Sequence, residues 1–444
     1  MQKIITRFPP SPTGYFHIGS ARTALFNFLF AKHNNGKMLF RSEDTDKERS
    51  KKEFEEDILK SMDWLHIDYD NRGEVIRQSE RTKIYQSYLE KMIAEDKAYL
   101  SKEESKKEAG NEVEVIRFKN PNKRISFEDI IRGEISFDTT ELGDFVIAKS
   151  MTEPLYHLSV VVDDYLMGIT HVIRGEDGIS NTPRQILIEE AIGAPRPIYG
   201  HLPLVLAPDR SKLSKRVHGE FVSLDYYKKR GYLPEAIINF LALLGWNPGG
   251  DQEIFGMDEF IEKFDISKVQ KSGAIFNIEK LDWFNKEHLK RKSWEEVEKE
   301  IIQRLDIDEK IAKKLAPSLF ERINKYGDLD ILRESGDLDY YTNTPKYEPK
   351  DLVWKKSKTT TPDTKKYLED VADIVEKIEE KDFTEPKIKN CIFPYAEERG
   401  RGDVLWATRF ALSGKEKSPD PFTLSYILGK EESIRRLRNA SKML

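Results

Sequence analysis

The chain has 444 residues, is 38% hydrophobic and 34% charged, and carries a net charge of −5. This length predicts about three domains with at least one sizeable core, and no apolar run approaches the roughly 20 residues of a membrane-spanning helix. The single cysteine, Cys391, excludes internal disulfides and multi-cysteine zinc sites. We therefore expect a cytoplasmic protein without a signal peptide, and the net charge neither favours nor excludes nucleic-acid binding.

The beginning of the chain predicts a strand, a tight turn and a helix. Residues 3–7 are expected to form the strand, Pro and Gly residues turn the chain over 9–14, and an apolar helical pattern follows over 21–32. In an α/β sheet, such a turn places backbone N–H groups and polar side chains where a phosphate-bearing ligand binds. The sequence therefore predicts a nucleotide site here.

The following segments predict the rest of a parallel sheet with helices between its strands. Strands are expected over 38–41, 158–162, 171–174 and 201–206, and helices over 51–66, 83–97 and 182–192. Residues 101–112 are polar and are expected to form an exposed connection, and alternating segments over 113–118 and 125–137 predict strands of a separate lobe. From residue 226 onward helical patterns dominate.

These elements predict an α/β Rossmann-type catalytic domain that contains an inserted α+β lobe and is followed by all-helical domains. The catalytic domain is expected to cover 1–100 and 156–232, the inserted lobe 101–155, and the helical domains 233–315 and 316–444.

Two basic motifs could bind a nucleotide together. His17 and Gly19 stand where the first strand becomes a helix, whose free N–H groups and partial positive charge suit a triphosphate. Lys212 and Lys215 lie in a basic segment after a predicted strand and could stabilise charge on a departing pyrophosphate. Each motif alone is compatible with an ordinary polar helix cap or a solvated basic loop, but their presence in one α/β domain favours the nucleotide interpretation.

The segments HIGS (17–20) and KLSKR (212–216) resemble the two signatures of class I aminoacyl-tRNA synthetases. The surrounding text is similar to bacterial glutamyl-tRNA synthetase in RFPPSPTGYFHIGSARTALFN, RSEDTD, VVVDDYLMGITHVIRGED, GYLPEAIINFLALLGW, GRGDVLW and ALSGKEKSPDPF. The resemblance spans nearly the whole chain. It implies a glutamate–tRNA ligase that uses ATP with Mg²⁺ to form glutamyl-adenylate and then charges tRNA(Glu). In that family the inserted lobe binds the acceptor end, and the helical domains contact the stem and bind the anticodon.

The resemblance also implies roles for residues of the two motifs. His17, Lys212 and Lys215 would be catalytic, stabilising the transferring phosphate. ATP would be bound by His17, Gly19, Asp177 and Lys215.

Glutamate would be bound by a second set of residues. Arg7 and Arg174 end two predicted strands and would grip carboxylate groups, with Ser11 and Tyr156 assisting and Glu43 pairing the ammonium group. Paired arginines would disfavour glutamine, since an amide leaves buried cations unpaired. Without the motifs, a structural salt bridge would be an equal interpretation of each residue.

Four features depart from the family pattern. Gly178 stands where many relatives carry histidine, and Ser20 replaces the second histidine of the general class I signature. The segment 99–102 lacks the cysteines that bind zinc in some relatives, so no structural zinc is expected. The inserted lobe also looks shortened through residues 101–112.

Basic residues of the C-terminal half are candidates for tRNA contact, namely Arg399, Arg401, Arg435 and Arg436. Phe393 stands where some relatives use arginine to restrict an anticodon base, which hints at relaxed reading. The alternative is a set of core aromatics with solvated charges.

Other functions stay open. The nearest is a non-discriminating enzyme that also charges tRNA(Gln) with glutamate. A glutaminyl-tRNA synthetase would carry a β-barrel anticodon domain, and a glutamyl transferase that modifies a tRNA base would lack the helical half. An RNA-binding module with a decayed active site is opposed by the intact motif residues. The resemblance implies a monomer.

Overall fold

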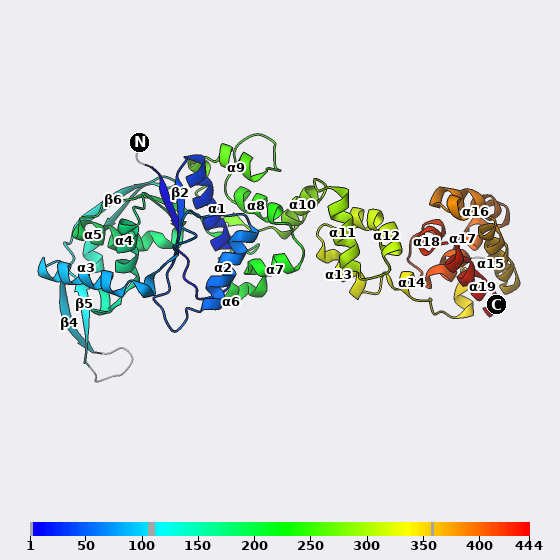
Figure 1. The fold of residues 1–444 in the computed structure, drawn as a ribbon, viewed down its shortest axis with the longest axis horizontal. Helices are drawn as coiled ribbons and strands as arrows, with labels where there is room; N and C mark the ends of the chain where they lie inside the picture. The colour runs from blue at the N-terminus through cyan, green and yellow to red at the C-terminus, as the bar shows by residue number, and fades with distance from the viewer. Residues whose placement is uncertain (1–2, 105–111, 357–358) are drawn as a thin grey trace. The chain divides into compact units, whose positions relative to one another are not determined.

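The computed structural model describes residues 3–104, 112–356 and 359–444, without the side chains of residues 215 and 216. By its internal contacts the chain divides into two compact units, Met1–Lys290 and Arg291–Leu444 (Figure 1). The first unit holds the strands found among the described residues, and the described part of the second is built from helices.

The first unit begins with a strand–helix–strand arrangement. β1 (Ile5–Phe8) and β2 (Lys37–Ser42) pair in parallel with Arg7 opposite Leu39, and α1 (Ile18–His33) connects them. Most side chains of α1 are buried because the helix is apolar on almost every face. The predicted strand, turn, helix and second strand are confirmed.

Two helices flank the short strand β3 (Ile76–Arg77), which pairs in parallel with β2. They are α2 (Lys52–Trp64) and α3 (Thr82–Ala94). Both match the helices predicted over 51–66 and 83–97 from their apolar spacing.

The inserted segment contributes strands to two sheets. One sheet is antiparallel and contains β4 (Ala98–Glu104), β5 (Glu112–Phe118), β8 (Phe145–Ser150) and β9 (Glu153–Pro154). The other joins β6 (Arg124–Asp129) and β7 (Gly133–Asp138) to the catalytic strands β10 (His171–Gly175) and β11 (Ile198–Leu202). The insertion is therefore continuous with the catalytic sheet on one side.

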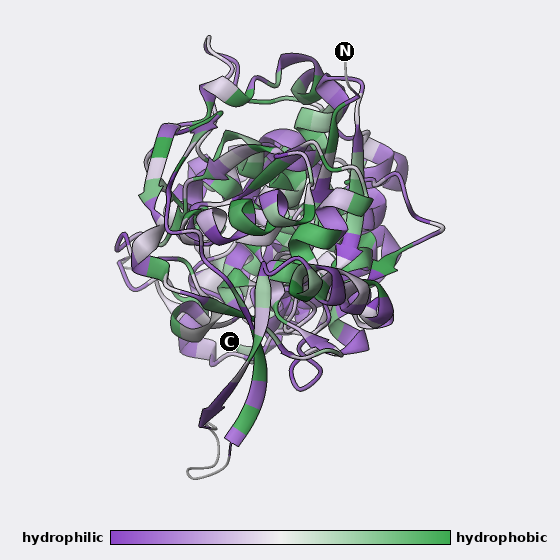
Figure 2. Ribbon diagram, turned by 90° about the vertical axis from the view of Figure 1, so that its left-hand side faces the viewer, coloured by the Kyte–Doolittle hydropathy of each residue, from purple (hydrophilic) through white to green (hydrophobic). Residues whose placement is uncertain are grey.

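The polar stretch predicted as an exposed connection is strand at both of its described ends. β4 runs to Glu104 and β5 begins at Glu112, and residues 105–111 lie outside the described residues. Figure 2 shows the β4–β5 ribbon projecting from the body of the unit, with hydrophilic and hydrophobic residues along it. Its exposed side chains include Leu100 and Val113.

The prediction of a strand over 158–162 is wrong. These residues belong to α4 (Tyr156–Leu166), in which Val160, Val161 and Val162 are all buried. A short continuous apolar run suits a buried strand and a buried helix equally, so periodicity does not separate them. The helix places Tyr156 in its first turn.

The second half of the catalytic sheet is parallel. β10 and β11 pair with each other in parallel, and α5 (Thr182–Ile192) connects them along the chain. The N–H of Thr170 donates to Ile5 O at 2.9 Å, which joins this half of the sheet to β1. The strand predicted over 201–206 is split: β11 ends at Leu202, and β12 (Val205–Leu206) pairs in parallel with β13 (Ala274–Ile275).

Helices complete the first unit after β12. They are α6 (Lys215–His218), α7 (Leu224–Lys229), α8 (Pro234–Leu243), α9 (Met257–Lys263) and α10 (Ile278–Leu289). Apolar side chains of α8, α9 and α10 pack into the same core as α1. This core fixes the N-terminus of α1 relative to the sheet.

The second unit contains α11 (Trp294–Leu305), α12 (Glu309–Arg322), α13 (Gly327–Glu334), α14 (Asp339–Thr342), α15 (Thr361–Glu376), α16 (Glu385–Arg399), α17 (Arg401–Ser413), α18 (Pro421–Leu428) and α19 (Lys430–Met443). The helical C-terminal region is confirmed. The division proposed between residues 315 and 316 falls inside α12, whereas the two units part at Lys290.

Candidate active site

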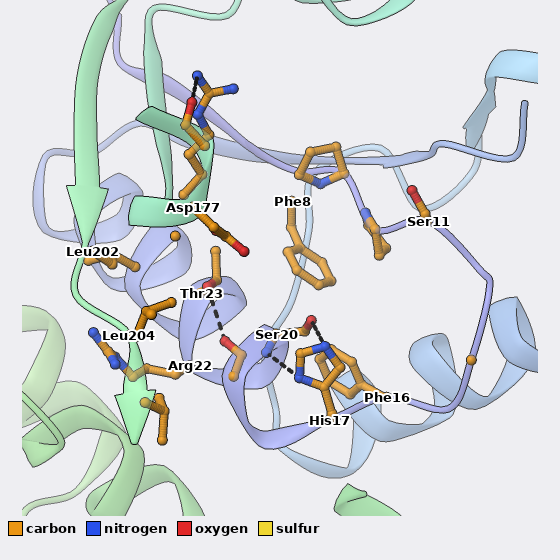
Figure 3. Close-up of a pocket in the computed structure, with 18 of the residues that line it drawn as sticks. Phe8, Ser11, Phe16, His17, Ser20, Arg22, Thr23, Asp177, Leu202 and Leu204 are labelled. Carbon is orange, nitrogen blue, oxygen red and sulfur yellow. Dashed lines mark hydrogen bonds between the residues drawn. The ribbon is translucent and has the colours of Figure 1, made fainter. Parts of the chain in front are cut away.

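A pocket of about 750 Å³ opens where β1, β10, the N-terminus of α1 and the loop after β12 meet (Figure 3). It is lined by every candidate for catalysis, ATP binding or glutamate binding whose side chain the structure describes, namely His17, Lys212, Arg7, Ser11, Glu43, Tyr156, Arg174, Gly19 and Asp177. Lys215 begins α6, but its side chain lies outside the described ones. Residues far apart in the sequence are thus brought to one cavity.

His17 caps the N-terminus of α1. Its Nδ1 accepts a hydrogen bond from the N–H of Ser20 at 3.2 Å, and its Nε2 lies 2.9 Å from Ser20 Oγ (Figure 3). Partial desolvation in the pocket lowers the pKa of His17, helped by the charge of Lys212 and opposed by that of Asp177. The imidazole is therefore neutral at neutral pH, with its proton on Nε2.

Gly19 makes room for the imidazole of His17. A Cβ at residue 19 would lie 3.3 Å from His17 Nδ1, which is tighter than ordinary van der Waals contact. The sequence predicts that Gly19 helps to bind ATP. In the structure, the space next to Gly19 is taken by the side chain that caps the helix.

Lys212 and Asp177 approach each other on the pocket wall. Lys212 Nζ lies 2.9 Å from Asp177 Oδ2, and both side chains are more than half exposed. In Figure 3, Asp177 lies with Leu202 and Leu204 on the wall that faces Ser11 and Phe16. The lysine is thus held at the cavity by a weak, solvent-screened pair.

Arg7 and Arg174 both line the pocket, and each has one buried nitrogen without a hydrogen-bond partner among the described residues. Arg7 Nε donates to Asp164 Oδ2 at 3.2 Å, while Arg174 donates from Nε to His201 Nε2 at 3.1 Å and from Nη2 to Thr182 Oγ1 at 2.9 Å. The Nη1 atoms of both arginines are buried and lack a hydrogen-bond partner among the described residues. A buried donor without a partner costs about 1–3 kcal/mol, so an anionic ligand that reached both would be favoured.

Glu43 belongs to a buried ion network around Arg41. Arg41 Nη2 donates to Glu43 Oε1 at 2.8 Å, and Nη1 donates to Asp164 Oδ1 at 2.7 Å. Arg41 Nε lies 3.8 Å from Asp163 Oδ2. Burial raises the pKa of Glu43, and the charges of Arg41 and Arg7 only partly oppose this. Glu43 lines the pocket as predicted, but one of its oxygens is already engaged by Arg41.

Ser11 and Tyr156 join this pocket to a second one. The second cavity, of about 800 Å³, shares Ser11, Thr13, Glu43 and Tyr156 with the first. Its remaining wall includes Lys149 and neighbouring residues of the inserted segment. Burial raises the pKa of the Tyr156 hydroxyl, with Glu43 adding to the effect, so the phenol is protonated and can donate.

Sequence reasoning missed three functional candidates. Arg22 lines the pocket, is buried, and has no described partner for Nε or Nη2, and burial lowers its pKa to about 10. Arg41 holds the carboxylate network, and His201 contacts Arg174. The available signal was a charged residue inside an apolar helix for Arg22 and inside an apolar strand for Arg41.

The described residues contain no group of three or more His, Cys, Asp or Glu side chains placed to hold a metal ion. Within the same residues, no helix is long and apolar enough to cross a membrane.

The candidates for RNA contact in the second unit differ in exposure. Arg399 is half exposed beside Glu398, and Arg401 lies over the ring of Phe393 at 4.7 Å. Arg435 is half exposed and pairs with Glu432. Arg436, by contrast, is only 3% exposed, and its guanidinium donates to backbone carbonyls, so it does not lie where an RNA ligand would reach it.

A parallel sheet, a helix N-terminus, a basic loop and the arginines Arg7 and Arg174 meet at one pocket, and comparison with known proteins assigns this chain to the class I tRNA synthetases. The family described as "tRNA synthetases class I (E and Q), catalytic domain" matches residues 3–109 and 100–283, and the family described as "Anticodon binding domain" matches residues 293–441. The chain belongs to the class I tRNA synthetase family for glutamate and glutamine.

Curated relatives match this chain over most or nearly all of its length. Glutamate–tRNA ligase 1 of Petrotoga mobilis is 40% identical over 466 residues, with 98% of this chain and 97% of that protein covered. Glutamate–tRNA ligase of Aquifex aeolicus is 49% identical over 319 residues, with 64% of this chain and 66% of that protein covered. The crystal structure of a glutamate tRNA ligase from Elizabethkingia meningosepticum in complex with its amino acid matches at a TM-score of 0.86 and 32% identity over 99% of both chains.

Proposed function

We propose that this chain is a glutamate–tRNA ligase that joins L-glutamate to ATP as glutamyl-adenylate and then transfers the glutamyl group to tRNA(Glu). The observation that carries the proposal is that Arg7 and Arg174 line one cavity together with His17 and Lys212, and that each arginine keeps a buried Nη1 without a partner among the described residues. An amino acid with a second carboxylate, bound beside a phosphate chain, would satisfy all four groups. The names of the full-length relatives support the same activity.

Glutamate would be held by its side-chain carboxylate between Arg7 and Arg174. Its ammonium group would face Glu43, and the phenol of Tyr156 would donate to a carboxylate oxygen. Replacing the carboxylate with the amide of glutamine would leave the two guanidinium groups without an anion, which is the kind of loss that gives strong discrimination. The α-carboxylate would remain free to react.

In the activation step, an oxygen of the α-carboxylate attacks the α-phosphorus of ATP. The bond from that phosphorus to the bridging oxygen of the β-phosphate breaks, and pyrophosphate leaves with the electron pair. His17 Nε2–H and the ammonium of Lys212 would stabilise the charge that builds on the phosphate oxygens, and we assign the same role to Lys215 at the start of α6. A ribose hydroxyl of tRNA then attacks the glutamyl carbonyl, and AMP departs.

The residues present fit a nucleotide that brings its own Mg²⁺. The pocket offers cations and N–H donors at His17, Lys212 and Arg22, which suit phosphate oxygens. The described residues form no carboxylate cluster that would hold a metal by itself. We therefore assign Mg²⁺ to the phosphates of bound ATP, where it would neutralise part of their charge.

The tRNA would contact both units. The second cavity, which meets the first at Tyr156 and reaches the inserted segment, is a suitable place for the acceptor end. Arg399, Arg401 and Arg435 remain candidates for the anticodon arm, and Arg436 is left out because it is buried. We further propose a cytoplasmic monomer without structural zinc, in which residues 233–290 contact the stem and the second unit, Arg291–Leu444, binds the anticodon.

Charging of purified tRNA(Glu) and tRNA(Gln) with labelled glutamate tests the proposal. We expect tRNA(Glu) to be charged in an ATP-dependent reaction, and a parallel reaction with labelled glutamine in place of glutamate to give no charging. Charging of neither tRNA by a folded, active-site-intact preparation would overturn the assignment. Charging of tRNA(Gln) as well would establish the non-discriminating subtype, which no described contact favours at present.

A further inference from the structure

Arg174 is held by three neighbours that leave only one of its nitrogens free. Its Nε donates to His201 Nε2 at 3.1 Å, and its Nη2 donates to Thr182 Oγ1 at 2.9 Å and to Gly178 O at 3.1 Å. Nη1, the remaining nitrogen, is buried and without a hydrogen-bond partner among the described residues. The orientation of the guanidinium is therefore set by groups outside the expected glutamate contacts.

His201 can serve as this anchor only in one protonation state. Because arginine can only donate, His201 Nε2 must carry no proton, and the ring proton resides on Nδ1. Nδ1–H donates to Asp129 Oδ2, and the two atoms lie 2.6 Å apart. Burial lowers the pKa of His201, and Arg174 and Arg132 also disfavour the protonated ring, while Asp129 opposes them.

Asp129 is fixed in turn by the backbone. Its Oδ1 accepts the N–H groups of Ile131 and Arg132 at 3.0 and 2.9 Å, and its Oδ2 accepts the N–H of His201 at 3.1 Å. Although burial opposes it, these hydrogen bonds and the one from the His201 ring lower the pKa of Asp129. Asp129 ends β6 of the inserted segment, so the insertion supplies part of the support for a catalytic-sheet residue.

Gly178 lies directly against the side chain of Arg174 and leaves room for it. A Cβ at residue 178 would lie 2.6 Å from Arg174 Nε, so any other residue would displace the guanidinium in this arrangement. Glycine is thus the residue at position 178 that permits this conformation of Arg174.

We propose that the buried Asp129–His201 pair is a positioning device that holds the guanidinium of Arg174 in place at the pocket wall, and so determines how tightly the substrate carboxylate is bound. His201 does not touch the substrate in this scheme. Its Nε2 accepts a hydrogen bond from Arg174 Nε, and its own orientation is fixed by Asp129. The inference rests on the proposed role of Arg174 in glutamate binding.

Two amide substitutions separate positioning from general packing. His201→Asn can keep a donor towards Asp129 but loses the acceptor at the Nε2 position, whereas His201→Gln places an amide oxygen near Nε2. We expect His201→Asn to raise the KM for glutamate by about tenfold or more, which corresponds to one oriented hydrogen bond, with kcat and the KM for ATP within about threefold. His201→Gln should restore the KM for glutamate to near the wild-type value.

His171→Asn is the matched control, because His171 is buried in the neighbouring strand β10 and contacts Thr170 and Phe30 rather than the pocket. It should leave the KM for glutamate unchanged. If His201→Asn does not fold, as judged by thermal unfolding, His201→Phe takes its place, since a phenyl ring can keep the stacking on Tyr199 but cannot accept a hydrogen bond. All assays contain tRNA.

Arg174→Ala distinguishes failure of this inference from failure of the proposed function. If Arg174→Ala raises the KM for glutamate but His201→Asn and His201→Phe do not, the positioning role is wrong and the glutamate site stands. Equal losses in the KM values for glutamate and ATP would also overturn it, by showing a general structural role. If Arg174→Ala leaves the KM for glutamate unchanged, both proposals fall.

Discussion

Lys212 Nζ lies 2.9 Å from Asp177 Oδ2, which links the loop after β12 to the turn after β10 along the pocket wall. The two side chains are 55% and 62% exposed, so the pair contributes about 0–1 kcal/mol to stability. The pair instead positions the ammonium group of Lys212 at the pocket wall. A triphosphate entering the pocket would compete with the carboxylate for the same ammonium group.

Lys212→Ala should lower the rate of glutamate-dependent pyrophosphate exchange by about 10²-fold, since it removes a charge that stabilises the departing phosphates. The free energy of unfolding should change by less than about 1 kcal/mol, because the pair is exposed. Lys229→Ala, which breaks the exposed pair with Asp225 outside the pocket, is the control. A similar loss of exchange in the control would refute the catalytic role of Lys212.

Lys215→Ala should slow glutamate activation far more than it weakens tRNA binding. The reason is the position of Lys215 directly after Ser214, which lines the pocket, at the start of α6. Pyrophosphate exchange with tRNA present and a direct tRNA-binding titration measure the two effects. Equal losses in both would identify the lysine as an RNA contact instead.

Arg41→Met should lower the free energy of unfolding by about 3–5 kcal/mol, because it leaves buried carboxylates of Asp164 and Glu43 without their shared cation. Denaturant unfolding measures the loss. Arg49→Met removes an arginine that is 73% exposed and pairs with Asp46, and it should cost less than about 1 kcal/mol. Similar values for the two variants would show that the buried network does not depend on Arg41.

The sequence was sufficient to predict the elements that carry the site, because they have strong local signals. The apolar strand, the Pro- and Gly-rich turn and the apolar helix that follow one another from β1 to α1 are confirmed. The valine run in α4 misled because a fully buried helix has no polar face to reveal its period. The strands of the insertion are divided between two sheets, with β6 and β7 joined to β10 and β11. This division depends on pairing between distant segments, which no local sequence pattern predicts.

The candidate site was predictable as a set of residues but not as a set of contacts. Motif residues such as His17 and Lys212 meet at one cavity as expected. The partners that orient them were not foreseen, since His201 and Asp129 stand 27 and 45 residues from Arg174 in the sequence and are joined to it only by the fold. Arg436 was misjudged because a basic run gives no indication of which arginine faces inward.

Glu189 should make the stability of the protein fall as the pH rises. Burial raises its pKa from 4.5 to about 7, with Tyr199 donating to it at 2.5 Å and opposing the shift. A carboxyl whose pKa is raised in the folded state stabilises the protein fully below the unfolded value, and this contribution is lost between about pH 4.5 and 7, amounting to about 3 kcal/mol.

Glu189→Gln should therefore flatten the pH dependence of the free energy of unfolding between pH 5 and 8, because its amide oxygen can still accept from Tyr199 and does not ionise. Glu190→Gln, at the neighbouring, more exposed carboxylate, serves as the control. Denaturant titrations across this range provide the measurement. An unchanged slope in Glu189→Gln would assign the pH dependence to other groups.

Arg435 and Arg436 are adjacent in α19, but their substitution should affect the free energy of unfolding very differently. Arg436 donates to the carbonyls of Tyr340 and Leu412 at 2.6 Å each and pairs with Glu432. Arg436→Met would leave those buried acceptors without donors, so it should lower the free energy of unfolding by about 3 kcal/mol or more.

Arg435→Met should leave the free energy of unfolding within about 1 kcal/mol, because this side chain is half exposed. If Arg435 contacts a phosphate of tRNA, its loss should weaken binding and reduce the slope of log affinity against log salt by about one, since one fewer counterion is released. Binding titrations at several salt concentrations measure this slope for wild type and variant. An unchanged slope and affinity would place Arg435 outside the RNA interface and leave Arg399 and Arg401 as the basic candidates of this unit.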